Sequence, residues 1–401
     1  GGDAASEFPL YAIVVIVIMN IIGIVLTPHF IVTGGGTAKS EQDARIGLVT
    51  GNFIKRFCTI GWVITALIVL TLFGDDMALI KDADMAWGTA TKELLGPLGI
   101  GLVGLMLACL LAALMSSVDC YMLVCSALVV RNIYVPFVNP KAGEKECLLL
   151  GRATGGVVVL GAVIISVTML DMFKQLELTW VVPMTFAALF WVGMYWRRAT
   201  TKAGWITVAF CVLTFFVLPR LIPAVAPSLR TEPSLVQTNL KTETGGGKSI
   251  YWSGGVEEKQ GIATGVGSFR FDMLIYDKIP GVDLTKVSNA ALKTLEFPFK
   301  IIAPFLVMII ASLLTKPNDK KALDRLYVKM KTPVDPVPEK DEAEIEKSYA
   351  NPDRFDKNKL FPNSNLEFQR PTKYDVIGFI TCFALCFAII GLVLLVAQIG
   401  T

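Results

Sequence analysis

The chain of 401 residues is strongly apolar: 53% of its residues are hydrophobic, only 18% are charged, and the mean hydropathy is +0.58. A formal net charge of +3 excludes the strong basic bias of a nucleic-acid-binding protein. The eight cysteines form no CxxC pair and there is one histidine, His29, so we expect neither a disulfide framework nor a metal site.

Apolar runs of the ~20 residues that a bilayer requires predict eight membrane-spanning helices. In chain order they are residues 9–28, 54–73, 96–133, 148–170, 178–196, 204–218, 297–314 and 374–400. The third run is too long for one perpendicular helix, so we expect it to tilt or to extend into water. The pattern predicts an all-α polytopic membrane protein in contact with the lipid bilayer, and we expect it in a bacterial inner or plasma membrane.

Positive charge tends to stay on the cytoplasmic side of a membrane. Here it follows the first, third and fifth runs, whereas the loop after the second run is acidic. This alternation predicts an external polar insert at residues 219–296 and a cytoplasmic polar segment at residues 316–373. Six helices within residues 1–218 precede the insert, and helices at residues 297–315 and 374–401 complete the chain.

The insert contains the stretch TETGGGKS, which resembles a phosphate-binding loop. Thr242 stands where that loop needs its first glycine, and no βαβ pattern surrounds it. We therefore expect a Gly-rich external loop, with room for a hairpin, rather than a nucleotide site.

The segment AALMSSVDC places polar groups deep in the third apolar run. An aspartate near the bilayer centre costs about 2.5–3.5 kcal/mol, so Asp119 needs a partner or a function. On a helix, one face carries Ala113, Ser116, Ser117 and Cys120. Two hydroxyls and a freed backbone carbonyl on that face form an oxygen site that suits Na⁺. The alternative is that both serines bond to their own turn or bridge to a neighbouring helix.

Four motifs in this order resemble the sodium:solute symporter family, and specifically its sodium/proline symporter branch. They are TPHFIVTGGGTAKSEQDAR at residues 27–45, AALMSSVDCYMLVCSALVVRNIY at 112–134, EKECLLLGRATGGVVV at 144–159 and GMYWRRATTKAGWITV at 193–208. The resemblance implies a partial LeuT-type inverted-repeat transporter fold, with the second repeat followed by extra C-terminal helices. The first apolar run then corresponds to the sixth core helix.

The resemblance also implies a function and its site. The chain would be the C-terminal half of a Na⁺-coupled secondary transporter of a small-molecule solute, incomplete without a missing N-terminal half or a companion membrane chain. Na⁺ would be held by the carbonyl of Ala113 and the hydroxyls of Ser116 and Ser117. Asp119 would either tune Na⁺ release or bond across to another helix.

The substrate side is less defined. Asn20 and Thr27 on the first run are candidate residues for it, but the aromatic and amide groups that the proline branch carries before its Pro-His pair are missing from residues 23–27. Proline is therefore a poor prediction for the solute.

A second hypothesis is a non-transporting membrane subunit that uses a symporter scaffold for assembly. An enzyme is not expected, because the sequence shows no nucleophile–base pair and no metal cluster.

Overall fold

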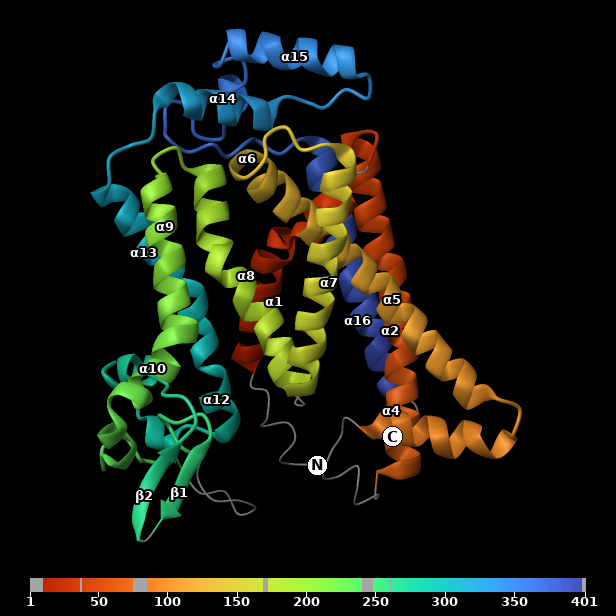
Figure 1. Ribbon diagram of the computed structural model, residues 1–401, viewed down its shortest axis with the longest axis vertical. Helices are drawn as coiled ribbons and strands as arrows, with labels where there is room; N and C mark the ends of the chain where they lie inside the picture. Colours follow the sequence, from red (N-terminus) through yellow and green to blue (C-terminus); the bar gives the residue numbers. More distant parts are fainter. Residues whose placement is uncertain are drawn as a thin grey trace. The chain divides into compact units, whose positions relative to one another are not determined.

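Helices make up most of the computed structural model, which describes residues 10–36, 38–74, 85–168, 172–239, 248–259 and 261–398 (Figure 1). They group into two compact units. The first unit combines the chain up to Thr27 with Leu176–Thr332 and Ala343–Gln369. The second combines Pro28–Gln175, Pro333–Glu342 and the chain from Arg370 onward.

Seven helices in the described part of the chain are long and apolar enough to cross a membrane. They are Glu41–Phe73, Leu102–Phe137, Glu144–Thr168, Gln175–Tyr195, Thr201–Val225, Glu296–Leu314 and Lys373–Leu395. They confirm the multi-pass expectation and correspond to the second to eighth predicted runs, with shifted ends. The first predicted run is not among these seven.

That first run, predicted at residues 9–28, is a shorter apolar helix at Leu10–Leu26. Helix α1 (Leu10–Gly23) passes into a 3₁₀ turn, η2 (Ile24–Leu26), and Thr27 is extended with φ −73° and ψ 121°. Thr27 precedes Pro28, whose ring disfavours helical backbone in the residue before it. The proline therefore ends the helix early.

The third run differs at both ends from the predicted residues 96–133. Gly99 and Gly101 have φ of 65° and 79°, a left-handed conformation that glycine adopts without strain. They separate the 3₁₀ turn η6 (Gly96–Leu98) from α5 (Leu102–Val129). Beyond α5 the helix continues through η7 (Val130–Tyr134) and α6 (Val135–Phe137), which confirms that the run exceeds one perpendicular span.

The other helices of the second unit are η3 (Phe30–Gly35), α2 (Glu41–Phe73), α4 (Ala86–Ala90), η5 (Thr91–Leu95), α7 (Glu144–Thr168) and α16 (Lys373–Ala397). α2 begins 13 residues before the predicted run at residue 54 because Ser40 caps it, its Oγ accepting from the Asp43 amide at 3.1 Å. An ion pair of 3.3 Å between Arg45 and Asp375 joins α2 to α16.

The first unit packs α1 against α8 (Met172–Tyr195) and α13 (Glu296–Leu314). Their shared buried cluster consists of Met19, Val181, Met184, Ala187 and Phe297. The Trp191 indole donates to the Ile22 carbonyl at 3.0 Å and so satisfies a backbone acceptor at the end of α1.

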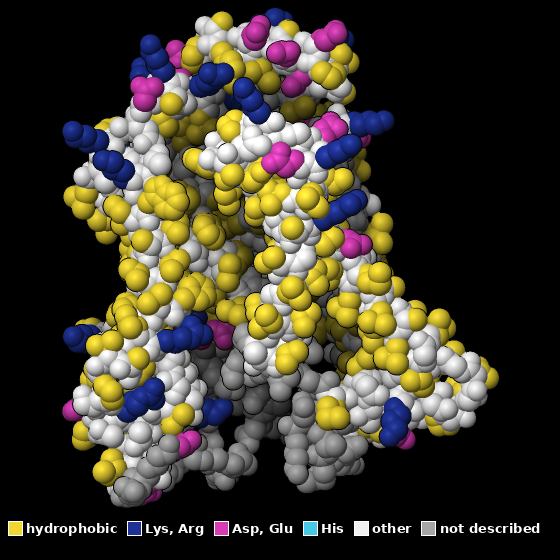
Figure 2. Space-filling view, in the orientation of Figure 1, with side chains coloured by type: hydrophobic (Ala, Val, Ile, Leu, Met, Phe, Trp, Pro, Cys, Tyr) yellow, Lys and Arg dark blue, Asp and Glu magenta, His cyan; other side chains and the backbone are white. Residues whose placement is uncertain are grey.

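A continuous helix in this unit comprises α9 (Thr201–Cys211), η8 (Val212–Val217) and α10 (Leu218–Val225). Hydrophobic side chains cover the middle of α9 in Figure 2, whereas Lys and Arg gather toward the ends of the helices. After α13 come α14 (Lys320–Lys331), α15 (Pro338–Ala350) and the turn η11 (Asp356–Asn358). The distribution of apolar and basic side chains in Figure 2 suits helices that cross an apolar layer.

The segment predicted as an insert, residues 219–296, has a hydrophobic core of its own, built around Trp252, Phe269 and Met273. It contains a hairpin after the Gly-rich stretch, in which β1 (Gly255–Lys259) pairs antiparallel with β2 (Ile262–Val266). The short helices η9 (Pro227–Thr231), α11 (Asp272–Asp277), η10 (Leu284–Lys286) and α12 (Asn289–Thr294) surround it. The Gly-rich stretch at residues 240–247 and the acidic loop at residues 75–84 lie outside the described residues.

Candidate functional site

The three predicted Na⁺ ligands lie together on α5. Ser116 Oγ donates to the Ala113 carbonyl oxygen at 2.9 Å, and Ser117 Oγ approaches the same oxygen at 3.3 Å. The steps of three and four residues bring both hydroxyls over one carbonyl, as the sequence predicts. This is also the bonding of the structural alternative, in which the serines bond back to their own turn.

The oxygen spacing suits a hard cation as well as a hydrogen bond. Oxygen ligands lie about 2.4 Å from an ion such as Ca²⁺, so neighbouring ligands at right angles are about 3.4 Å apart. The Ala113–Ser117 separation of 3.3 Å is of that size, and the Ala113–Ser116 separation of 2.9 Å is somewhat shorter. A hydroxyl that turns its proton away from Ala113 presents a lone pair beside the carbonyl oxygen.

The surroundings of these oxygens are apolar and open. Ser116 and Ser117 are exposed in their unit, and so are the neighbouring Leu114, Met115 and Val118, at 62%, 65% and 39%. Three oxygens satisfy only part of the six or more that a hard cation takes. The remaining ligands of a cation bound here would therefore be water or groups from outside the described part of this unit.

Asp119 lies on the same helix, one turn after Ser116, and is also exposed. Among the residues that the structure describes, its carboxylate has no hydrogen bond and no ion pair. The expectation that it bonds across to another helix therefore finds no partner in these segments.

The two substrate-side candidates lie in the other unit. Asn20 Nδ2 donates to the Ile16 carbonyl at 2.9 Å within α1, and Thr27 Oγ1 donates to the Ile24 carbonyl at 2.6 Å. Both polar groups are thus bonded to their own helix. The structure does not bring either of them into one unit with Ser116 and Ser117.

His29 packs against an aromatic ring of α5. Its ring meets the ring of Tyr121 on α5 edge-on, with centroids 4.6 Å apart. In the described part of the chain, no group of three or more His, Cys, Asp or Glu side chains is placed to hold a metal ion.

A charged cluster that sequence reasoning missed lies in the first unit around Glu367, whose side chain is 1% exposed. Its carboxylate accepts from Arg197, Lys331 and Lys359, the last at 3.0 Å. Backbone hydrogen bonds of 2.9 Å join Glu367 to Tyr195 and Arg197 to Asn365. The segment at residues 359–369 is thereby fastened to the turn between α8 and α9.

The charges set the ionisation of Glu367. Burial alone raises the pKa of its carboxyl, but hydrogen bonds from Lys331, Arg197 and Lys359 outweigh burial and hold the pKa below its usual range. The motif at residues 193–208 contains Arg197, but it does not predict that a carboxylate far along the chain pairs with this arginine.

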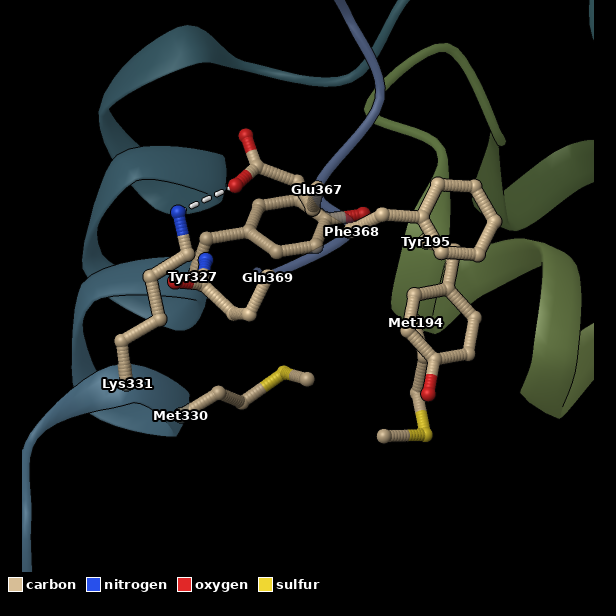
Figure 3. A pocket seen from close by; sticks show the side chains of 8 residues that line it. All are labelled: Met194, Tyr195, Tyr327, Met330, Lys331, Glu367, Phe368 and Gln369. Carbon is tan, nitrogen blue, oxygen red and sulfur yellow. Dashed lines mark hydrogen bonds and ion pairs between the residues drawn. The ribbon is translucent and has the colours of Figure 1, made fainter. Parts of the chain in front are cut away.

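A pocket of about 320 Å³ opens beside this cluster (Figure 3). The rings of Tyr195 and Phe368 stack in it with centroids 4.5 Å apart, and Met194 and Met330 line it. Lys331 on α14 reaches across to Glu367, so the ammonium group is already neutralised.

Comparison with known proteins identifies the family of the chain. The model of the sodium:solute symporter family matches residues 7–208. The chain is similar to the osmoregulated proline transporter OpuE of Bacillus subtilis, with 30% identity over 43% of this chain and 34% of that protein. It is also similar to a sodium/proline symporter of Haemophilus influenzae (27% identity, 31% of this chain, 25% of that protein) and to a sodium/glucose cotransporter of Vibrio parahaemolyticus (24%, 47% and 37%). The chain thus spans between 25% and 37% of the length of these relatives.

Proposed function

Because the chain belongs to the sodium:solute symporter family, we propose that it works in a transporter that couples movement of a small solute to movement of Na⁺. It is a multi-pass integral membrane protein, and its helical architecture agrees with the LeuT-type fold of that family. Relatives named for proline and for glucose support a small polar solute as the cargo.

We further propose that Na⁺ binds at the Ala113 carbonyl and the hydroxyls of Ser116 and Ser117. The observation that carries this proposal is the convergence of both hydroxyls on one carbonyl oxygen, at 2.9 and 3.3 Å, in the middle of an apolar helix. A transported ion must leave again, so a site whose hydroxyls can return to the backbone when the ion departs suits this role. Asp119, one turn away, raises the local attraction for a cation.

The test is the Na⁺ dependence of solute uptake by the natural full-length polypeptide in proteoliposomes. Replacing Ser117 by alanine removes one oxygen ligand and should raise the half-saturating Na⁺ concentration about tenfold or more, the equivalent of a charge-assisted hydrogen bond. The matched control is Ser126→Ala on the same helix, because Ser126 bonds to Met122 and Gly151 instead.

The outcomes are distinct. A raised Na⁺ requirement in Ser117→Ala alone supports the site, whereas an unchanged Na⁺ requirement in both variants contradicts it. Uptake that needs no Na⁺ in the unmodified protein contradicts the symport itself. The absence of any uptake, with Na⁺ also failing to bind, favours the assembly subunit.

A further inference from the structure

Helix α14 lies at the ends of two helices that are long and apolar enough to cross a membrane. The Tyr327 hydroxyl donates to the carbonyl of Gly193, in the last turn of α8, at 2.6 Å. At the start of the segment, Arg198 donates to the carbonyls of Leu313 and Thr315 at 3.1 and 2.9 Å. Only five residues separate the end of α13 from the start of α14. The ends of such helices are where lipid headgroups are expected.

The segment from Lys316 to Lys331 is basic, with six Lys or Arg residues against two Asp. Both aspartates are engaged within the protein, because Asp324 pairs with Arg197 and Asp319 caps α14 at the Ala322 amide. The basic side chains are largely uncommitted. Four exposed lysines have no ion pair with any described residue, and these are Lys316, Lys320, Lys321 and Lys329.

The same helix exposes apolar side chains one turn apart. Tyr327 and Val328 are buried at 2% and 1%, whereas Leu326 and Met330 are 50% and 45% exposed. Met330 also lines the pocket beside Met194, at the end of α8. A helix with exposed apolar side chains between lysines is typical of one that lies in a membrane interface.

We propose that α14 is an interfacial helix that binds anionic phospholipids. The four free lysines contact headgroup phosphates, and Leu326 and Met330 enter the boundary between headgroups and acyl chains. The bilayer is the occupant that fits, because α14 directly continues a membrane-spanning helix and its uncommitted charge is positive. Each lysine near an anionic surface contributes about fivefold to the association constant. The proposal does not depend on Na⁺ transport.

The experiment measures amide hydrogen exchange of the whole chain in nanodiscs of phosphatidylcholine, with and without phosphatidylglycerol. We expect amides of α14 to exchange about tenfold more slowly in the anionic discs, since lipid contact opposes opening of the helix. Salt at ~1 M should remove most of the difference, because it reduces the Debye length to about 3 Å.

The test variant replaces Lys320, Lys321 and Lys329 by glutamine, which keeps helix propensity while removing three charges. The matched control makes the same replacement at the exposed lysines Lys340, Lys347 and Lys357, which follow α14 in the chain. Loss of the lipid effect in the first variant alone supports the proposal. Equal protection in neutral and anionic discs, or an effect that both variants retain, overturns it. Leu326→Gln provides a second variant, which should reduce the protection in anionic discs with the charges intact.

Discussion

Gly155 on α7 lies directly against Met122 on α5. A β-carbon built on Gly155 would come within 2.4 Å of Met122 Cγ and 2.8 Å of its Sδ, far inside van der Waals contact. One turn earlier, the Gly151 carbonyl accepts a hydrogen bond of 2.7 Å from Ser126 on α5. Small residues thus let these two helices approach closely, and α7 packs against the helix that carries the candidate Na⁺ ligands.

Replacing Gly155 by valine should separate the two helices and lower the free energy of unfolding by about 1–3 kcal/mol, the usual cost of overpacking. Gly156→Val is the matched control, because a β-carbon at Gly156 meets nothing within 4 Å. Thermal unfolding of both variants in the same detergent measures the difference. Equal unfolding midpoints for the two variants would contradict the close contact between Gly155 on α7 and Met122 on α5.

Glu367 should be the most sensitive carboxylate of the segment that follows α14. Glu367→Gln leaves Arg197, Lys331 and Lys359 around a neutral group, and breaking a buried pair in this way costs about 3–5 kcal/mol. Exchange of amides in residues 359–369 should then quicken strongly, whereas Glu346→Gln on the exposed side of α15 should leave them unchanged. Slow exchange retained in Glu367→Gln would mean that the backbone pairing alone holds the segment.

The lowered pKa of Glu367 also predicts that the stability of the protein depends on pH. Its pKa is lowered in the folded protein, so its contribution to stability is fully present above the unfolded value of about 4.3. That contribution is lost as the pH falls from there through the lowered folded value. The difference in unfolding midpoint between the unmodified protein and Glu367→Gln should therefore be constant at neutral pH and shrink below pH ~4. A difference that grows on acidification would show that folding raises the pKa of Glu367 instead of lowering it.

The spans could be predicted because the bilayer imposes a length on apolar helices, and seven of the eight predicted runs are such helices. Their ends could not be predicted from hydropathy. A cap at Ser40 starts α2 well before its apolar run, and the left-handed Gly99 and Gly101 delay α5. Each of these helix starts depends on local backbone geometry, which cannot be predicted from the apolar content of the sequence.

In the candidate site, too, some features could be predicted from the sequence and others could not. Helical spacing alone brings Ser116 and Ser117 over Ala113, so local periodicity was sufficient to predict this grouping. Glu367 meets Arg197 from 170 residues away, and only the folded chain reveals that contact. Interactions within one turn can be predicted from sequence, whereas contacts that depend on how elements pack cannot.

The most direct test of a Na⁺ site on α5 is binding of radioactive Na⁺ to the purified natural polypeptide. We expect saturable binding that is weakened at least tenfold in the Ser116→Ala/Ser117→Ala double variant, which loses two ligand oxygens. We expect nearly normal binding in Ser126→Ala, whose hydroxyl bonds elsewhere. Binding of equal affinity in the double variant would show that the two hydroxyls serve only the helix backbone, and that Na⁺ is held at another place.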